Sequence, residues 1–244
     1  MKKTPVKLTS YAQDFTKLLD TIKPSKNRYE IFSDWLIVAS AALYSWKRDK
    51  SVEEEYLQVV KQYKAPELEK LCQLLAITVE ALEEKTHDFL GEVFTEGNLS
   101  NEKKGQFFTP FHVSQLMAKL TIGERDIKNY RVIRVIDPCC GSGGLLIAGI
   151  LEMEEHGINY QKDVLFNATD IDHRCARMCF IQLSLLAAPA VITCGNSLTM
   201  ETFWQRETIG YHLSDMDKRI NMENIIDFVT KPEFLKDTVH EKAG

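Results

Sequence analysis

The sequence predicts an α/β protein in which a region of helices precedes a parallel, doubly wound sheet. The first hundred residues repeat apolar side chains at helical spacing. From about residue 105, short β-branched runs alternate with longer helical segments, a pattern typical of parallel strands joined by crossover helices. A glycine-rich loop follows the first of these runs and opens a helix, as in nucleotide-binding sheets.

Residues 1–104 are expected to form an N-terminal helical domain. The apolar pattern predicts helices over residues 28–46, 51–63 and 67–84. The segment Ser51–Glu54 matches a capping box, and Pro66 suits the first turn of the helix that follows it. Thr86 is expected to cap one further short helix.

Residues 105–200 are expected to form the α/β core. The sequence predicts strands over residues 132–137, 164–170 and 191–193, and helices over residues 111–121, 144–155 and 172–187. After Met200 the chain becomes polar. We expect residues 201–244 to form a C-terminal helical tail without a further strand.

The composition favours a soluble, cytoplasmic protein with no membrane partner. Hydrophobic residues make up 44% of the chain and charged residues 27%, which is ordinary for a globular protein. The longest apolar stretch, Trp35–Trp46, is too short to span a bilayer, and the N-terminus lacks the apolar segment of a secretory signal. The six cysteines include no pair of CxxC motifs, so we expect reduced thiols and no metal site.

Positive charge is concentrated at the N-terminus. Residues 1–50 carry ten Lys/Arg against five Asp/Glu, whereas the remainder carries twenty against thirty. Such a basic arm can contact phosphates. A solvated helix surface explains the same charge and is the favoured interpretation.

The segment Asp137–Gly144, DPCCGSGG, is the most informative motif of the chain. Its glycines let the backbone pass close to a ligand, and the helix that follows offers unpaired N–H groups. No Gly-Lys-Ser/Thr follows, which excludes a P-loop, and Leu146 stands where G-x-G-x-x-G requires Gly or Ala. The Asp137 carboxylate can accept a hydrogen bond from a hydroxyl or ammonium group. We expect a nucleoside ligand with a positive charge; a purely structural turn is the alternative.

Three further segments carry candidate binding residues. In Thr169–Asp172, Asp170 is placed to accept ribose hydroxyls and Ile171 to lie against an adenine, whereas Asp172 can cap the next helix. Asn196, in the segment GNSL, can pair with an adenine edge or form a plain Asx turn. Thr109, in the segment GQFFTP, fits a helix N-cap followed by proline and can also bind a carboxylate.

Together these motifs resemble the N6-adenine DNA methyltransferase family, especially the modification subunits of type I restriction systems. The resemblance runs from Asp88, in the segment DFLGEVF, to about Leu198. It implies a Rossmann-like methyltransferase core that binds S-adenosylmethionine and acts on double-stranded DNA beside specificity or other restriction–modification subunits. It further implies that Thr109 holds the donor carboxylate, Asp137 its ammonium group and Asp170 its ribose. The other donor-binding positions that it implies are Pro138, Gly141, Ser142, Gly143, Ile171 and Asn196.

One motif of that family is not found in the sequence. Family members hold and stack the flipped target adenine with Asn/Asp-Pro-Pro-Tyr/Phe, but none of the seven prolines here adjoins another. The nearest match, Lys231–Phe234 (KPEF), lacks the second proline. With only three expected strands, the core also looks abbreviated. Catalytic residues stay unassigned; the aromatic candidates to stack a base, or simply to pack a C-terminal helix, are Phe203, Trp204 and Tyr211.

Three functions therefore remain open. The first is methylation of DNA adenine, with target-base contacts supplied by another chain or by residues not yet identified. The second is a donor-binding subunit without chemistry of its own, which regulates or assembles a DNA-modification complex. The third is methylation of a small molecule or a protein, because many enzymes on this fold lack the Pro-Pro motif.

Overall fold

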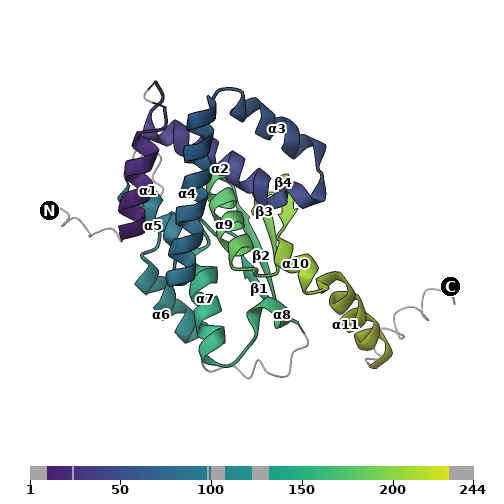
Figure 1. The fold of residues 1–244 in the computed structure, drawn as a ribbon. Coiled ribbons are helices and arrows are strands. Elements are labelled where there is room, and N and C mark those ends of the chain that lie inside the picture. The colour runs from purple at the N-terminus through teal and green to yellow at the C-terminus, as the bar shows by residue number, and fades with distance from the viewer. Residues whose placement is uncertain (1–9, 24, 98, 100–107, 123–131, 231–244) are drawn as a thin grey trace.

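The computed structural model describes residues 10–23, 25–97, 99, 108–122 and 132–230 (Figure 1). The N-terminal helices are α1 (Ser10–Asp20), α2 (Arg28–Tyr44), α3 (Lys50–Val60), α4 (Ala65–Glu84), α5 (Phe89–Glu96) and α6 (Phe111–Ile122), with a 3-10 turn at Ser45–Lys47. The core contains β1 (Ile133–Asp137), α7 (Gly144–Glu155), α8 (Tyr160–Asp163), β2 (Val164–Asp170), α9 (His173–Leu185), β3 (Ala190–Asn196) and β4 (Glu201–Glu207). Two helices follow, α10 (Ile209–Leu213) and α11 (Met216–Thr230).

Polar caps, rather than apolar spacing alone, decide where several N-terminal helices begin. The prediction that a box at Ser51 opens α3 is wrong, because Asp49 caps the helix and accepts a hydrogen bond from Ser51 N at 2.9 Å. The prediction that Thr86 caps α5 is also wrong. Asp88 takes that place and accepts from Gly91 N at 3.1 Å. In both helices the cap is a carboxylate, which is a stronger hydrogen-bond acceptor than the hydroxyl group expected from the sequence.

The N-terminal helices and the α/β core share one hydrophobic interior. Phe15 of α1 meets Trp35 of α2 edge-to-face at a centroid distance of 5.0 Å and Phe89 of α5 at 5.9 Å. The same cluster of buried side chains continues into the core, where Tyr44 of α2 contacts Phe180 of α9 at 5.9 Å. The helices therefore cover one face of the sheet directly.

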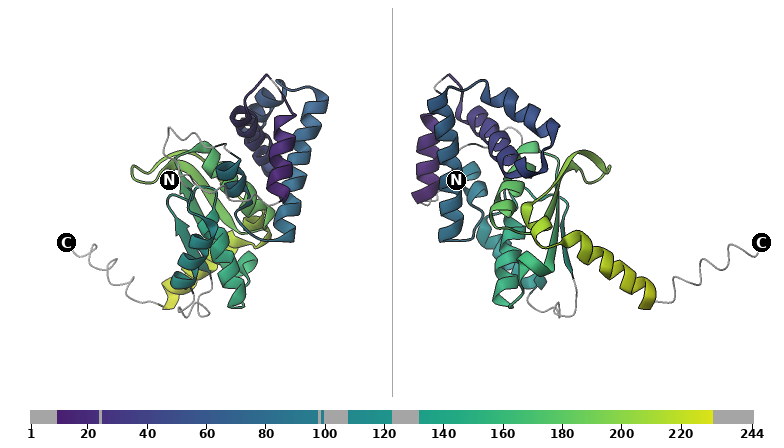
Figure 2. Two further views of the ribbon diagram at one scale, coloured as in Figure 1. Left: turned by 90° about the vertical axis from the view of Figure 1, so that its left-hand side faces the viewer. Right: turned by 45° about the vertical axis from the view of Figure 1, so that its right-hand side comes forward.

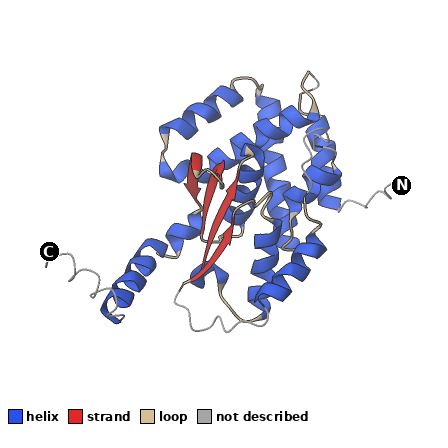
Figure 3. Ribbon diagram, turned by 180° about the vertical axis from the view of Figure 1, so that it is seen from behind, coloured by secondary structure: helices blue, strands red, loops and turns tan. Residues whose placement is uncertain are grey.

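The sheet has the strand order β1-β2-β3-β4, with β1, β2 and β3 parallel. The α/β prediction is confirmed by this arrangement. In β2 and β3, every second side chain, including Phe166 and Ile192, is fully buried on the face that carries the helices. Figure 3 shows the opposite face, over which no helix of the described residues passes at the centre of the sheet.

The region directly after Met200 corrects the sequence prediction. Instead of a helical tail, Glu201–Glu207 forms β4, antiparallel to β3, and the hairpin projects beyond the sheet (Figure 2). Met200 turns the chain with a φ of +61°. The side chains of Trp204 and Arg206, two residues apart, both face the helices: Trp204 contacts Arg177 of α9, and Arg206 donates to Ser40 of α2 at 3.4 Å. Polarity masks this period-2 pattern in the sequence. The predicted helix is present at α10 and α11, whereas residues 231–244, with the segment KPEF, lie outside the described residues.

No helix among the described residues has both the length and the apolar content needed to cross a membrane.

Replacing Phe166 with alanine should lower the free energy of unfolding by about 3–5 kcal/mol, because it leaves a cavity beneath the fully buried centre of β2. Urea denaturation followed by circular dichroism measures this change. Gln205→Ala, at an exposed position of β4, is the matched control and should change the free energy by less than about 0.5 kcal/mol. Equal losses in the two variants would contradict the assignment of the buried face.

Candidate functional site

The loop between β1 and α7 is held in a sharp bend by its glycines. Gly141 and Gly143 have φ values of +55° and +95°, in the left-handed region that favours glycine. A Cβ at Gly141 would also lie 2.8 Å from the ring of Phe108. On the other side, Cys140 N donates to the carbonyl of Thr169 at 2.9 Å. The loop is thereby fixed across the carboxyl ends of β1 and β2.

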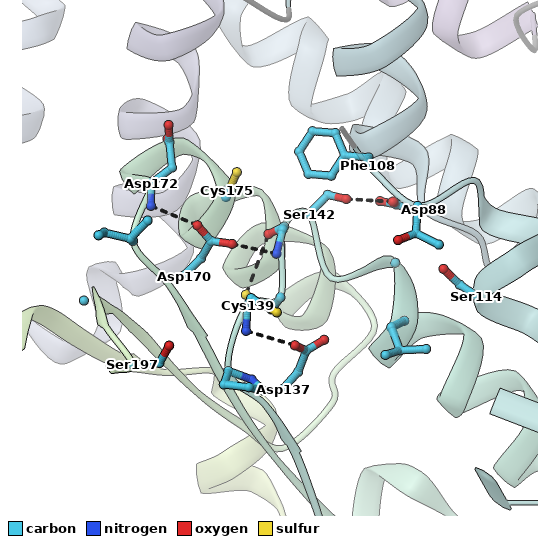
Figure 4. A pocket seen from close by; sticks show the side chains of 18 of the residues that line it. Asp88, Phe108, Ser114, Asp137, Cys139, Ser142, Asp170, Asp172, Cys175 and Ser197 are labelled. Atoms are coloured by element: carbon cyan, nitrogen blue, oxygen red, sulfur yellow. Dashed lines mark hydrogen bonds between the residues drawn. The ribbon is translucent and has the colours of Figure 1, made fainter. Parts of the chain in front are cut away.

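Two aspartates end these neighbouring strands and face the same space (Figure 4). Asp170 of β2 accepts hydrogen bonds from Gly141 N at 2.8 Å and from Asp172 N at 2.9 Å. Asp137 of β1 accepts from Cys139 N at 3.1 Å through Oδ1, and none of the described residues donates to its Oδ2. Burial raises the pKa of both carboxyl groups. Since each carboxylate has about four acceptor sites, both retain capacity for a ligand.

These groups line a cavity of about 690 Å³ at the carboxyl end of the sheet. Its volume lies within the range of small-molecule sites. Gly143 lies behind the loop, where a Cβ would be 3.1 Å from Cys179 Sγ. Residues 105–107 of the GQFFTP segment lie outside the described residues, whereas Phe108 lines the cavity. The predicted donor-binding positions that line it are Thr109, Asp137, Pro138, Gly141, Ser142, Asp170, Ile171 and Asn196.

The charge of the cavity wall is entirely negative among the described residues. The lining includes the carboxyl groups of Asp88, Asp137, Asp170 and Asp172, and no Lys, Arg or His. Of these four carboxyl groups, Asp172 alone has a cationic partner among the described residues, the guanidinium of Arg174. Such a wall attracts a cation and disfavours an anion such as a nucleotide phosphate.

Two of the predicted positions have local roles as well. Asp172 caps α9, because its Oδ1 accepts from Arg174 N at 2.8 Å, as the capping alternative predicts. Asn196 forms an Asx turn in which its Oδ1 accepts from Leu198 N at 3.0 Å and Thr199 N at 3.3 Å. The oxygen of Asn196 is therefore used within the chain, whereas its amide nitrogen has two N–H groups that can donate to a ligand.

Thr109 does not occupy the cap position that the sequence predicts for it. Helix α6 begins at Phe111, and the carbonyl of Pro110 accepts the first bonds of the helix, from Val113 N at 2.8 Å and Ser114 N at 3.2 Å. The Thr109 side chain is exposed and lies at the cavity wall. Its hydroxyl is thus positioned beside the helix rather than within its cap.

Asp88 is a further residue of the site that the sequence motifs do not indicate, and it is among the most buried charged groups of the described residues. It is 7% exposed and lines the cavity at the start of α5. Its Oδ2 accepts from Ser142 Oγ at 2.6 Å, and its Oδ1 accepts from Gln182 Nε2 at 2.8 Å and from Gly91 N. Burial raises the pKa of Asp88, and these three donors oppose that shift. The carboxylate therefore ties the N-terminal helices to the glycine loop.

Gln182 of α9 closes this network. Its Nε2 also donates to the carbonyl of Ser142 at 2.8 Å, and its Oε1 accepts from Leu90 N at 3.0 Å. The side chains of Asp88 and Gln182 are both almost fully buried. The only signal for this arrangement in the sequence is the position of an aspartate directly before α5, since its partners lie 54 and 94 residues away.

The aromatic candidates for base stacking lie away from the cavity wall. Trp204 donates from Nε1 to His173 Nδ1 at 3.0 Å and lies under the guanidinium of Arg206 at 4.7 Å. Tyr211 is buried and donates to Asp217 Oδ1 at 2.6 Å. Phe203 stacks on the ring of His173. These contacts favour the packing interpretation for Trp204 and Tyr211.

The thiols of the site are poor candidates for nucleophilic chemistry. Cys139 and Cys140 line the cavity together with Cys175. Burial raises the pKa of the Cys139 thiol, and the neighbouring Asp137 and Asp170 raise it further, so the thiol stays protonated at neutral pH. Within the described part of the chain, no group of three or more His, Cys, Asp or Glu side chains is arranged to hold a metal ion.

Replacing Asp88 with alanine should lower the free energy of unfolding by about 2–4 kcal/mol, because the cap of α5 is lost and buried donors are left unpaired. Asp88→Asn should cost about 1 kcal/mol or less. The Oδ1 of an asparagine at position 88 can accept hydrogen bonds from Gly91 N and Gln182 Nε2, while its Nδ2 donates to Ser142 Oγ. Urea denaturation at neutral pH compares the two. An asparagine variant as unstable as the alanine variant would show that the charge, rather than the hydrogen-bond geometry, is required.

Comparison with known proteins gives a family and distant relatives. The sequence profile of the family N-6 DNA Methylase matches residues 86–229, which is more than half of the chain. A 99-residue stretch is 28% identical to the Type I restriction enzyme MpnII methylase subunit of Mycoplasma pneumoniae. That stretch is 41% of this chain and 17% of the subunit, so the chain spans only a small part of this relative.

Two solved structures align over most of this chain. A Listeria monocytogenes protein assigned to the class I S-adenosylmethionine-dependent methyltransferases has a TM-score of 0.42 and 17% identity over 74% of this chain and 51% of its own. The methyltransferase subunit of a type I restriction-modification system from Streptococcus thermophilus has a TM-score of 0.36 and 12% identity, over 73% and 55%. The family profile covers Asp88, the glycine loop and the strands β1 to β4. Because it matches more than half of the sequence, the chain belongs to the N-6 DNA Methylase family.

Proposed function

We propose that this chain binds S-adenosylmethionine in the cavity and takes part in adenine-N6 methylation of DNA as a subunit of a restriction–modification complex. The observation that carries the proposal is the cavity wall, which combines a glycine loop with carboxylates and no cationic side chain among its described residues. S-Adenosylmethionine supplies a methyl group on a positively charged sulfonium. Its ammonium group adds a second positive charge, so an acidic cavity suits it well.

The described residues fit this ligand group by group. In the proposed arrangement, Asp170 accepts hydrogen bonds from the ribose hydroxyls, while Gly141 N holds the Asp170 carboxylate in place. Asp137, whose Oδ2 has no donor among the described residues, accepts the ammonium group. Thr109 binds the carboxylate of the donor from the exposed start of α6.

The remaining positions shape the cavity. Gly141, Gly143, Pro138 and Ser142 keep the loop clear for the methionine portion, and Ile171 lies against the adenine. Asn196 meets the adenine edge through its amide nitrogen, since its oxygen is held in the Asx turn.

The contribution of this chain to methyl transfer would be positioning. The donor methyl group and the acceptor nitrogen must approach to about 3–3.5 Å in line. The rigid loop, fixed by Cys140 and by the Asp88–Ser142–Gln182 network, can hold the donor without rearrangement. The carboxylates hold the ammonium and ribose groups, which prevents the donor from rotating in the cavity.

A second candidate function is donor binding without chemistry, in a subunit that regulates or assembles the complex. Two observations favour it: the sequence contains no adjacent prolines, and none of the aromatic candidates Phe203, Trp204 and Tyr211 lines the cavity. Incubation with tritiated S-adenosylmethionine and mixed-sequence DNA separates the two functions. Label in adenine supports the enzyme, whereas binding without transfer supports the donor-binding subunit.

Isothermal titration calorimetry should detect binding of S-adenosylmethionine by the purified chain. Asp137→Asn and Asp170→Asn should each weaken it about tenfold or more, which is about 1.4 kcal/mol, because each removes a charged acceptor from the cavity. Asp14→Asn, on the exposed surface of α1, is the control and should bind as the unmodified chain does. Absence of binding heat at high donor concentration would overturn the proposed function.

Donor affinity should also fall as the pH is lowered. Burial raises the pKa of Asp137 and Asp170 in the unliganded chain, so protonation neutralises the cavity above the ordinary aspartate pKa of about 3.9. A cation binds the ionised form more tightly than the protonated form, so the association constant rises with pH until both groups are ionised. Titrations from about pH 4, near the ordinary aspartate pKa, up to pH 7 measure this slope, and the Asp137→Asn variant should flatten it. Affinity that increases toward low pH would contradict the assigned electrostatics.

A further inference from the structure

Ser114 of α6 carries a buried hydroxyl group that makes no hydrogen bond within the described part of the chain. The residue is 1% exposed, and its Oγ has no partner among the described residues. A serine in a helix often donates to the carbonyl four residues earlier. Here that carbonyl, of Pro110, instead accepts from the backbone N–H groups of Val113 and Ser114. Because buried polar groups are nearly always paired, the unpaired hydroxyl calls for an explanation.

The same residue lines the cavity at the carboxyl end of the sheet. Figure 4 shows the Ser114 oxygen directed from α6 toward the side of the cavity where Asp88 lies. Both oxygens of Asp88 already accept hydrogen bonds, from Ser142, Gln182 and Gly91. The Ser114 hydroxyl is therefore free to bind a group that enters the cavity.

The carboxylate is the one charged group of S-adenosylmethionine that the acidic cavity wall disfavours. No Lys, Arg or His is among the described lining residues, so this carboxylate needs neutral hydrogen-bond donors. Four hydroxyl groups line the cavity, those of Thr109, Ser114, Ser142 and Ser197. Ser142 donates to Asp88 at 2.6 Å, and Ser197 directly follows β3. The two hydroxyl groups that remain, of Thr109 and Ser114, belong to α6 and the segment that leads into it.

The order of the polar groups along the cavity places the carboxylate near Ser114. Figure 4 shows Asp170 and Ser197 on one side of the cavity, Asp88 and Ser114 on the other, and Asp137 between them. If Asp170 binds the ribose and Asp137 the ammonium group, the donor extends from the first side toward the second. Its carboxylate, attached to the same carbon as the ammonium group, then lies beyond Asp137. Ser114 directly follows the first turn of α6, a turn without acidic side chains, and the positive end of a helix dipole favours an anion.

We propose that Ser114 is a specificity-determining residue of the donor site, and that its hydroxyl donates to the carboxylate of S-adenosylmethionine. This proposal rests on the proposed function, because it assigns one further contact in that site. Thr109 binds the same carboxylate from the exposed start of the segment, where water competes, whereas Ser114 binds it from a buried position. A hydrogen bond to a charged group is stronger than one between neutral groups, and burial strengthens it further. The hydroxyl is thus satisfied only when a ligand with a carboxylate is bound.

Isothermal titration calorimetry with two ligands tests this assignment. The ligands are S-adenosylmethionine and decarboxylated S-adenosylmethionine, which keeps the sulfonium and the amine but lacks the carboxylate. Ser114→Ala should weaken binding of S-adenosylmethionine by about tenfold, because a hydrogen bond to a charged group is lost. The same variant should change binding of the decarboxylated ligand by less than about twofold, since no carboxylate is there to contact position 114.

Ser184→Ala is the matched control. Ser184 of α9 is 5% exposed and its Oγ is also buried without a partner among the described residues, but it does not line the cavity. This variant should bind both ligands as the unmodified chain does. In urea denaturation, both alanine variants should unfold at the same urea concentration as the unmodified chain or at a higher one. Each replaces an unpaired buried hydroxyl with a methyl group and a serine with a better helix former.

Unchanged affinity of Ser114→Ala for S-adenosylmethionine would overturn the assignment. Equal weakening for both ligands, or unfolding of Ser114→Ala at a lower urea concentration than Ser184→Ala, would show that Ser114 supports the fold rather than binding the carboxylate. These results would also overturn the assignment. Failure of the proposed function would differ from all of them, because the unmodified chain itself would then not bind S-adenosylmethionine.

Discussion

The buried carboxylate of Asp88 is the interaction on which the rest of the structure depends. It lies where three parts of the chain meet: the start of α5, the glycine loop through Ser142, and α9 through Gln182. A buried carboxylate is costly unless hydrogen bonds surround it, and here three donors satisfy it without a cation. Loss of any one member leaves the others unpaired in the interior. The N-terminal helices and the core are therefore coupled, and the cavity wall at Ser142 is held by hydrogen bonds to side chains of their shared interior.

The Asp88 carboxyl group also belongs to the acidic wall of the cavity, which limits the charge of the ligand that can bind there. Asp88, Asp137 and Asp170 all have pKa values raised by burial, which means that each charged form is destabilised in the unliganded chain. A bound cation relieves that cost, so part of its affinity comes from charges already held in place. An anion would increase the cost. This sign preference holds for any ligand and explains why a loop with glycines and helix N–H groups need not be a phosphate site.

The parts of the fold that sequence could predict are those encoded within a few residues. The β-branched run before Asp137 and the glycines after it predict a strand, a bend and a helix, and the structure has them. Strand β4 was not predicted because its alternating pattern includes polar and charged residues, and the partners of Trp204 on α9 and of Arg206 on α2 are distant in sequence. For the same reason, the sequence did not indicate that Asp88 belongs to the site. Its local signal is that of a helix cap, and only the tertiary fold brings Ser142 and Gln182 to it.

The open edge of β1 follows from how the strands are ordered. Each crossover from β1 through β3 moves the sheet in one direction, and the antiparallel β4 then closes that side with a charged, bulged strand. Nothing in the described chain returns to the other side of β1. Asp137, which lines the cavity, and the exposed Ile136 therefore both lie on β1, whose outer edge has no neighbour among the described residues.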